Sequence, residues 1–476
     1  MRNRLVRHAF ILTVLMGLLK PGAVAAQDRM CDPGEEDCRA ILINFIRNER
    51  VGIDVAFWFM EDARYTTELI RKYQEGVPVR VLMDTRANET YPLNAQRLAE
   101  LQSAGIPMRR RLTNYILHWK MMLFHGQNVV EFSGANYSPN AWRPETAVPY
   151  ENYTDESIYF TSDTPVVDSF RTRYDDYWVN STEWANYANI VQPLARRYDI
   201  IPKDPALNFP PGENYRTRAL AAYRAENWMI DAIMYRITDR QHADAMIAAV
   251  ARGVHVRLIT EQVQYRLPSR MWHSWNVDRM YMGGVLIKHR GHAGLNHQKS
   301  VILYDQNRSL PGDQSMVIFG SSNWTSPSAN GQVEHNYFTT KPYILAWFMN
   351  QFSRKWNNLG GVVETIDFVP LPPDVPANPN PADGNGNLPL RPTLSWYGGP
   401  WAHLYDLYID TNPGFTHPAV FSLAEPSSKT ETSRFSYTLP VTLAPYTTYY
   451  WRVVGKTMAL RTRTSPIWAF TTRSGG

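Results

Sequence analysis

The sequence predicts an α/β protein made of two copies of one lobe, followed by a small all-β sandwich. Three observations predict this architecture. A long segment recurs at a nearly constant offset, apolar strand-like runs alternate with helical periodicity inside each copy, and after residue 366 the composition changes to a Pro/Asn/Gly-rich stretch followed by short strand-like runs. At 476 residues and 44% hydrophobic composition, the chain is long enough to fill more than one core.

The duplication is visible in segments that match along the chain. Residues 53–57 resemble residues 230–234, and residues 76–82 resemble residues 253–259, both at an offset of 177 positions. His118 precedes His297 by 179 positions, and Glu156 precedes Glu334 by 178. An offset this constant over about 140 residues indicates an internal repeat.

Each copy reads as strand, helix, strand, a pair of motif strands and a closing helix. Residues 66–74 and 242–251 carry helical periodicity, and Gly76 and Gly253 follow them as stop signals. This alternation favours an α/β layer with a mixed, largely buried sheet. We place the first lobe at residues 27–205 and the second at residues 206–366.

Each lobe carries a short polar motif beside an apolar run. His118 and Lys120 in the first copy, and His297 and Lys299 in the second, stand two positions apart, so each pair lies on one face of a strand. The next strand of each copy ends in a group of small and polar residues, Ser133-Gly134-Ala135-Asn136 and Gly320-Ser321-Ser322-Asn323. Imidazole, ammonium, amide and hydroxyl groups converging in this way suit an anionic ester, most naturally a phosphate.

The two motifs resemble the HxKxxxxD and GSxN motifs of the phospholipase D superfamily, a group of phosphodiesterases that includes lipases, phospholipid synthases and nucleases. The resemblance covers roughly residues 39–360 and implies two α/β sandwich lobes in a pseudo-twofold relation, with one site between them. It also implies that His118 is the nucleophile, that His297 is the general acid and base, and that Glu156 and Glu334 hydrogen-bond a catalytic histidine.

The chemistry of these groups fits a phosphodiesterase, but the symmetry of the two motifs leaves open which histidine is the nucleophile. One histidine can attack phosphorus to give a phosphohistidine, while the other protonates the leaving alkoxide. Lys120, Lys299 and the amides of Asn136 and Asn323 can stabilise the charge that develops on the phosphoryl oxygens. We expect substrate contacts from three serines and no metal or cofactor; the serines are Ser133, Ser321 and Ser322.

Both copies depart from the motif. The aspartate expected five residues after each lysine is replaced by His125 and Tyr304, which removes a supporting side chain and leaves the reacting groups. The first copy has Ser-Gly in place of Gly-Ser, and the second has an enlarged turn at residues 306–314. These differences keep open the alternative of a catalytically degenerate, surface-binding protein.

The N-terminus predicts export. Residues 1–26 combine three arginines, an apolar run from residue 9 to residue 19 and a small-residue cleavage region, as a signal peptide does. Cys31 and Cys38, the only cysteines, are expected to form a disulfide in a secreted or periplasmic protein. Without residues 1–26 the chain has 45 basic and 44 acidic residues, so its overall charge favours no class of partner.

The C-terminal part is predicted to contain a linker at residues 367–387 and a β-sandwich at residues 388–476. Residues 443–445 followed by Tyr449 resemble the tyrosine corner of fibronectin type III domains. The resemblance implies a binding or spacing module, with a possible cell-surface or extracellular ligand. The sequence as a whole is expected to act as a monomer.

The sequence therefore predicts an exported phosphodiesterase of phospholipase D type that hydrolyses or transfers phosphatidyl groups. The main alternative is a secreted endonuclease that uses the same motifs on nucleic acid. Some residues allow two interpretations each. His289 and His292 could join a metal site or flank the phosphate site, residues 109–111 could bind phosphates or form a solvated charge run, and Trp119 and Trp142 could contact substrate or pack in the core.

Overall fold

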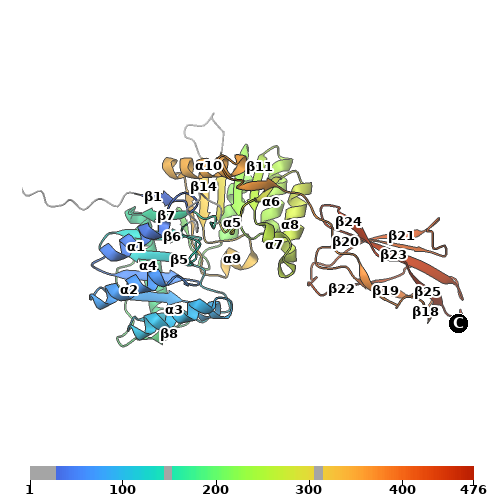
Figure 1. Cartoon of the computed structure of the whole chain (residues 1–476), viewed down its shortest axis with the longest axis horizontal. Helices are drawn as coiled ribbons and strands as arrows, with labels where there is room; N and C mark the ends of the chain where they lie inside the picture. The colour runs from blue at the N-terminus through green and yellow to red at the C-terminus, as the bar shows by residue number, and fades with distance from the viewer. Residues whose placement is uncertain (1–27, 144–152, 305–314, 476) are drawn as a thin grey trace, which may run out of the picture.

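The computed structural model describes residues 28–143, 153–304 and 315–475. Two α/β lobes lie against each other, and a β-rich region extends away from the second lobe (Figure 1). The predicted signal peptide at residues 1–26 and the enlarged turn at residues 306–314 lie outside the described residues. Among the described helices, none is both long and apolar enough to cross a membrane.

The first lobe is built on an eight-stranded mixed sheet in the order β1-β7-β6-β5-β2-β3-β4-β8. Its strands are β1 (Arg29–Cys31), β2 (Ile53–Phe57), β3 (Val79–Met83), β4 (Met108–Arg111), β5 (Lys120–Phe124), β6 (Val129–Ser133), β7 (Ile158–Thr161) and β8 (Trp184–Ala188). Its helices are α1 (Cys38–Asn48), α2 (Ala63–Gln74), α3 (Pro92–Ser103) and α4 (Thr164–Val179), with a 3-10 helix η1 (Thr85–Glu89).

The second lobe repeats this topology strand for strand, in the order β9-β15-β14-β13-β10-β11-β12-β16. Its strands are β9 (Leu207–Asn208), β10 (Met229–Met234), β11 (His255–Thr260), β12 (Leu286–Arg290), β13 (Lys299–Leu303), β14 (Met316–Gly320), β15 (Asn336–Thr339) and β16 (Thr365–Asp367). Its helices are α5 (Tyr215–Ala225), α6 (Arg240–Ala251), α7 (Gln262–Tyr265), α8 (Met271–Met282), α9 (Ser326–Asn330) and α10 (Pro342–Asn357), with a 3-10 helix η2 (Pro268–Arg270).

Equivalent helices begin and end for the same local reasons in the two lobes. The side chains of Asp62 and Asp239 cap α2 and α6 by accepting backbone N–H groups of their first turns. Gly76 and Gly253 follow the two helices with φ angles of +87° and +92°, a conformation that glycine adopts at little cost. The predicted stop signals are therefore confirmed.

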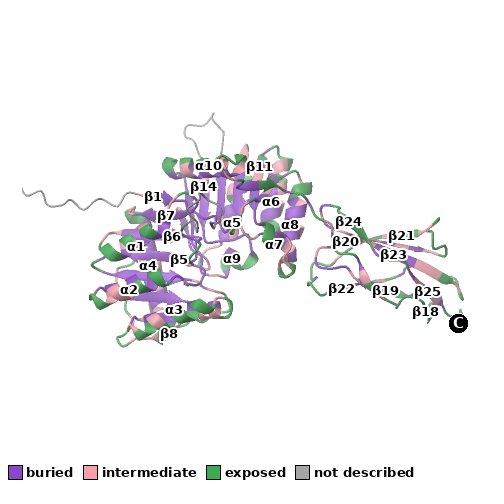
Figure 2. Ribbon diagram, in the orientation of Figure 1, coloured by how far each residue is buried: buried purple, intermediate pink, exposed green. Residues whose placement is uncertain are grey.

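The lobes are joined by a shared apolar core in which repeat-equivalent residues meet. Phe132 on β6 stacks against Phe319 on β14 with ring centroids 5.9 Å apart, and Tyr159 on β7 stacks against Tyr337 on β15 at 6.2 Å. Contact between equivalent residues is the signature of a twofold interface. The strands of both lobes are largely buried (Figure 2). The predicted pseudo-twofold arrangement is confirmed, and it brings the two motifs to one place.

The missing motif aspartates are replaced from a neighbouring strand. His125 Nε2 lies 2.8 Å from Asp54 Oδ2 in the first lobe, and the Tyr304 hydroxyl donates to Asp231 Oδ2 at 2.6 Å in the second. Asp54 and Asp231 occupy equivalent places on β2 and β10, and both pair with an arginine of the next strand. In each lobe the carboxylate that the motif lacks is thus supplied by the neighbouring strand, β2 in the first lobe and β10 in the second.

The C-terminal region is a two-sheet β structure with its own core. Its strands are β17 (Ala377–Asn380), β18 (Asn385–Leu388), β19 (Thr393–Tyr397), β20 (Leu404–Asp410), β21 (Ala419–Ala424), β22 (Arg434–Thr438), β23 (Thr448–Lys456), β24 (Thr462–Thr464) and β25 (Trp468–Thr472). The Ala444 N–H donates to the Tyr449 hydroxyl at 3.0 Å, as in a tyrosine corner.

The predicted linker is too long, because β17 and β18 lie within residues 367–387 or extend just past them. Both are edge strands, β17 beside β19 and β18 beside β25. Edge strands tolerate proline and asparagine, so a composition typical of linkers concealed them. At the other end of the chain, Cys31 and Cys38 form the expected disulfide.

Candidate active site

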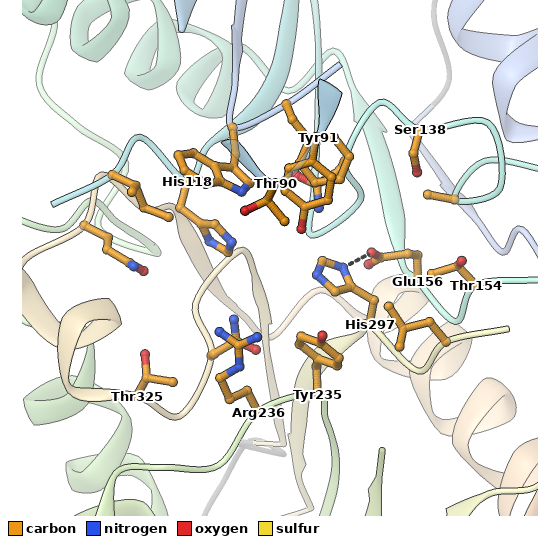
Figure 3. A pocket seen from close by; sticks show the side chains of 18 of the residues that line it. Thr90, Tyr91, His118, Ser138, Thr154, Glu156, Tyr235, Arg236, His297 and Thr325 are labelled. Atoms are coloured by element: carbon orange, nitrogen blue, oxygen red, sulfur yellow. Dashed lines mark hydrogen bonds and ion pairs between the residues drawn. The ribbon is translucent and has the colours of Figure 1, made fainter. Parts of the chain in front are cut away.

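A cavity of about 520 Å³ lies between the two lobes, and five of the predicted site residues line it. These residues are His118, Asn136, Glu156, His297 and Asn323. Figure 3 shows the two imidazoles on opposite sides of the open space, His118 from the first lobe and His297 from the second. The duplicated motifs therefore form one site and not two.

Backbone hydrogen bonds between the lobes hold each histidine in place. The His118 N–H donates to the Val333 carbonyl oxygen at 2.9 Å, and the His297 N–H donates to the Asp155 carbonyl oxygen at 3.1 Å. Val333 and Asp155 each directly precede a site glutamate, Glu334 and Glu156. Each histidine is thus fastened to the segment that carries the glutamate of the other lobe.

The side chains follow the same crossed pattern. His118 Nδ1 lies 2.8 Å from Glu334 Oε2, and His297 Nδ1 lies 2.5 Å from Glu156 Oε1. With Nδ1 engaged, Nε2 is the ring nitrogen left to face the cavity in both cases. Neither lobe alone supplies both members of either site pair, His118 with Glu334 or His297 with Glu156.

The two glutamates differ in their surroundings. Glu334 accepts hydrogen bonds from the hydroxyls of Ser321, at 2.5 Å, and Ser328, at 2.9 Å. In contrast, Glu156 Oε2 is buried with no hydrogen-bond partner among the described residues. Counted back from the two motif asparagines, Gly134 stands where the second lobe has Ser321, so the first lobe lacks this hydroxyl.

These surroundings set the protonation of the Glu334 pair. Burial lowers the pKa of His118 to about 4, although Glu334 opposes the shift. Burial acts to raise the pKa of Glu334, but His118, Lys120 and Ser321 outweigh it and the pKa is lowered. The pair is therefore a neutral imidazole beside a carboxylate near pH 7, with a proton on Nδ1 and a lone pair on His118 Nε2.

Near pH 7 the pair of His297 and Glu156 holds one proton more than the pair of His118 and Glu334. Burial raises the pKa of Glu156 to about 8, although Lys299 and Lys120 oppose the shift, whereas burial and Lys299 lower the pKa of His297. Whether the extra proton resides on Glu156 or on His297 Nδ1, the cavity-facing Nε2 of His297 carries a hydrogen. The two imidazoles of the pseudo-symmetric site thus differ at the atom that faces the cavity, since His118 Nε2 has a lone pair and His297 Nε2 carries a hydrogen.

The motif lysines are buried behind the cavity wall and do not line the cavity. Lys120 Nζ donates to the carbonyl oxygen of His118 at 2.8 Å, and Lys299 Nζ donates to that of His297. Burial lowers the pKa of both ammonium groups, for Lys299 to about 8. Their direct contact with phosphate stays a prediction, while their charge already acts on both histidines.

The motif asparagines meet the expectation for substrate-facing groups. Asn136 and Asn323 both line the cavity, and their side-chain oxygens have no hydrogen-bond partner among the described residues. Each side-chain NH₂ group can donate a hydrogen bond to a phosphoryl oxygen, and each unpartnered amide oxygen can accept one from a hydroxyl of the substrate or of water. The two amides are therefore available to a bound phosphodiester through their N–H groups.

The three motif serines are not placed as predicted, because none of them lines the cavity. The Ser133 hydroxyl accepts the Ala135 N–H, and the Ser322 hydroxyl accepts a hydrogen bond from Asn336. Ser321 donates to Glu334. Ser133 ends β6, and Ser321 and Ser322 directly follow β14. All three side chains are buried and bond to neighbouring groups of the protein.

Sequence reasoning missed a set of cavity residues outside the motifs. They include Trp58, Phe59, Tyr91, Tyr235, Arg236 and Arg270. The repeat itself contained a signal, because the 177-position offset places Trp58-Phe59 opposite Tyr235-Arg236, directly after the first long strand of each copy. Arg270 gave no such signal.

Packing bears on several residues that allowed two interpretations. Trp119 and Trp142 are buried in core clusters, and Arg109 is buried with its guanidinium donating to backbone carbonyl groups. His289 packs against Tyr265 and Phe368. Within the described residues, no three His, Cys, Asp or Glu side chains are grouped so that they could hold a metal ion.

Comparison with known proteins agrees with this geometry. The PLD-like domain of cardiolipin synthase matches residues 42–178 and 224–356, once in each lobe and over more than half of the chain. The chain belongs to this phospholipase D-like family. The C-terminal β structure lies outside the match.

Relatives of this phospholipase D-like protein are distant in sequence. Human mitochondrial cardiolipin hydrolase is 23% identical over 197 residues, which cover 41% of the chain and 70% of that protein. The mitochondrial cardiolipin hydrolase of Chlamydomonas reinhardtii is 23% identical over 128 residues, which cover 27% of the chain and only 51% of that protein. Phosphatidylserine synthase of Haemophilus influenzae shares the fold, with a TM-score of 0.54 at 15% identity over 72% of the chain and 88% of that structure.

Proposed function

We propose that this protein is an exported phosphodiesterase of phospholipase D type, which hydrolyses or transfers phosphatidyl groups through a phosphohistidine. The observation that carries the proposal is the pair of facing histidines, each bonded through Nδ1 to a glutamate of the opposite lobe. Export rests on the sequence of residues 1–26 and is supported by the Cys31–Cys38 disulfide.

In the first step, His118 Nε2 attacks phosphorus with its lone pair. The bond from phosphorus to the leaving oxygen breaks, and His297 Nε2 gives its proton to the alkoxide that departs. Glu334 stabilises the positive charge that develops on the His118 ring, through the Nδ1 hydrogen bond. Asn136 and Asn323 donate to the phosphoryl oxygens as their charge grows.

In the second step, the His297–Glu156 pair takes a proton from the incoming water or alcohol. The new oxygen attacks phosphorus, the bond to His118 Nε2 breaks, and both histidines return to their starting states. The buried ammonium groups of Lys120 and Lys299 offset the negative charge of the bound phosphodiester.

The size of the cavity favours a lipid headgroup over a polynucleotide. A volume of about 520 Å³ suits one phosphodiester with small substituents, whereas single-stranded nucleic acid usually occupies a longer groove of several nucleotides. The relatives named for cardiolipin and phosphatidylserine support a lipid substrate. The endonuclease and the degenerate binding protein remain the alternatives that an assay must test.

The direct test is hydrolysis by the mature protein, offered phosphatidylcholine vesicles and single-stranded DNA in parallel. His118→Ala and His297→Ala are the test variants. His255→Ala, an exposed histidine on β11, is the matched control. We expect lipid turnover that both site variants abolish and that the control variant retains.

Other outcomes point elsewhere. DNA cleavage with the same pattern of losses, and no lipid turnover, would move the protein to the nucleases. Turnover that survives in both site variants would contradict the paired-histidine mechanism. The absence of any turnover, with vesicle binding retained, would support the degenerate binding protein.

A further inference from the structure

Two arginines of the second lobe line the cavity without an acidic partner. Arg236 follows β10, and Arg270 ends the 3-10 helix η2. Within the described residues, no carboxylate oxygen lies within 4.0 Å of either guanidinium, whereas Arg216, Arg257 and Arg279 of the same lobe each have such a partner. Positive charges held at a cavity wall with no counter-ion mark a place where an anion can bind.

The side-chain contacts of the two arginines leave donors unused. Arg236 Nε donates to Gln264 Oε1 at 3.1 Å, and its guanidinium lies 5.3 Å from the centre of the Tyr235 ring. Arg270 Nε is buried and has no hydrogen-bond partner among the described residues. A buried N–H without an acceptor costs free energy, which a bound anion would recover.

The charges of the two arginines also act on each other and on the site. Burial and the charge of Arg236 lower the pKa of Arg270, and Arg236 is among the charges that lower the pKa of His297. Figure 3 shows Arg236 extending from the second lobe toward the two histidines. The Tyr235 ring, which Arg236 contacts, lies against His297 with ring centroids 4.8 Å apart. Arg236 is therefore beside His297, the histidine that protonates the leaving group.

The opposite wall has a different character. The repeat offset places Trp58 and Phe59 of the first lobe where the second lobe has Tyr235 and Arg236. Phe59 stacks on Tyr91 with ring centroids 3.7 Å apart. The first lobe thus gives the cavity an aromatic wall, and the second lobe gives it a cationic wall. A phosphodiester joins two alcohols through one phosphorus, and walls of different character can favour a different alcohol on each side.

We propose that Arg236 and Arg270 bind a second anionic group on the substrate, carried by the leaving alcohol. This subsite rests on the proposed phosphodiesterase function and adds a preference to it. The preferred substrate is a phospholipid whose headgroup bears its own oxyanion, either a carboxylate or a further phosphate. Arginine suits both, because its planar donor pair matches either group.

The test compares matched lipids that differ only in that anion. Dihexanoyl phosphatidylserine is paired with dihexanoyl phosphatidylethanolamine, which lacks the carboxylate. Dihexanoyl phosphatidylglycerol phosphate is paired with dihexanoyl phosphatidylglycerol, which lacks the second phosphate. Short-chain monomers exclude any effect of vesicle surface charge. The readout is the ratio of kcat/KM values within each pair, for wild type, Arg236→Gln, Arg270→Gln and the exposed control Arg240→Gln.

We expect wild type to prefer the anionic member of at least one pair by about tenfold or more, as for a charge-assisted hydrogen bond. The lipid pair that shows the preference identifies the bound anion as a carboxylate or a phosphate. The ratio should fall toward one in Arg236→Gln and Arg270→Gln, and should persist in Arg240→Gln. A wild-type ratio near one for both pairs, or a ratio that neither site variant changes, would overturn the subsite.

Binding of glycerol phosphate, measured by calorimetry, separates this subsite from the proposed function. If wild type hydrolyses no lipid but binds glycerol phosphate about tenfold more tightly than the two arginine variants do, the phosphodiesterase proposal fails and the subsite stands. If lipid is hydrolysed and binding is equal in all variants, the subsite fails and the function stands. Arginine-dependent cleavage of single-stranded DNA without lipid turnover would overturn the assignment to a lipid headgroup.

Discussion

Ser321→Ala tests whether the charge on Glu334 makes His118 the nucleophile. The Ser321 hydroxyl is one of three hydrogen-bond partners of this carboxylate, at 2.5 Å, beside Ser328 and His118. A hydrogen bond to a charged group contributes about 1.5–3 kcal/mol, and about 1.4 kcal/mol corresponds to a tenfold change in an equilibrium. Removing it should make protonation of the His118–Glu334 pair at least about tenfold easier.

This change in protonation should appear on the acidic side of the profile of kcat/KM against pH. Because a protonated pair has no lone pair on His118 Nε2, the acidic limb of kcat/KM should move upward by about one pH unit. The assay follows kcat/KM from about pH 3 to pH 9 with the soluble substrate bis(p-nitrophenyl) phosphate. At the acidic end Ser321→Ala should be about tenfold slower than wild type, with a smaller difference near neutrality.

A matched control exists in the adjacent residue. The Ser322 hydroxyl contacts Asn336 and not Glu334, so Ser322→Ala should leave the acidic limb where it is. If Ser321→Ala lowers the rate equally at every pH, and the limb does not move, then the hydroxyl acts by packing alone. The reasoning that it sets the charge on Glu334 would then be refuted.

Three further predictions follow from the same site. Glu334→Gln should lower kcat by about 10³–10⁴-fold, because His118 loses the carboxylate that fixes its tautomer and stabilises its positive charge. Glu156→Gln should lower kcat to a similar extent, because an amide cannot exchange the proton that the His297–Glu156 pair gives and takes back. A loss below tenfold in folded variants, checked by circular dichroism, would argue against the crossed pairs. The profile of kcat/KM against pH should be bell-shaped. It should rise through about pH 4, as His118 loses its proton, and fall near pH 8, as the His297–Glu156 pair loses its extra proton. A flat profile would contradict the two roles. Activity should persist in a chelator such as EDTA, since the proposed steps use imidazole, ammonium and amide groups; complete loss that a divalent ion restores would show that a metal is needed.

Much of the fold could be predicted because helices and strands depend on local residue patterns, and these patterns occur twice in the sequence. The repeat offset and the alternation of strands and helices indicated two equivalent lobes, and the lobes share one strand order. The prediction failed for β17 and β18, where proline and asparagine on edge strands resemble a linker. A composition signal cannot distinguish an exposed edge strand from an extended connection.

The candidate site could be predicted only in part. The motifs identified His118, His297 and the two asparagines, all of which line the cavity. The serines were misplaced because strand alternation gives the face of a sheet to which a side chain points, but not what that face covers. The roles of His125 and Tyr304 also stayed hidden, since their partners Asp54 and Asp231 lie on another strand.

The sequence by itself determined the repeat, the motifs and the family, because each depends on residue identity and local spacing. The tertiary structure decided the pairing of His118 with Glu334, which are 216 positions apart, and of His297 with Glu156. It also brought Arg236 and Arg270 to one wall of the cavity. The physical reason is that these contacts depend on how the lobes pack across their pseudo-twofold interface, which the local pattern of either repeat does not specify.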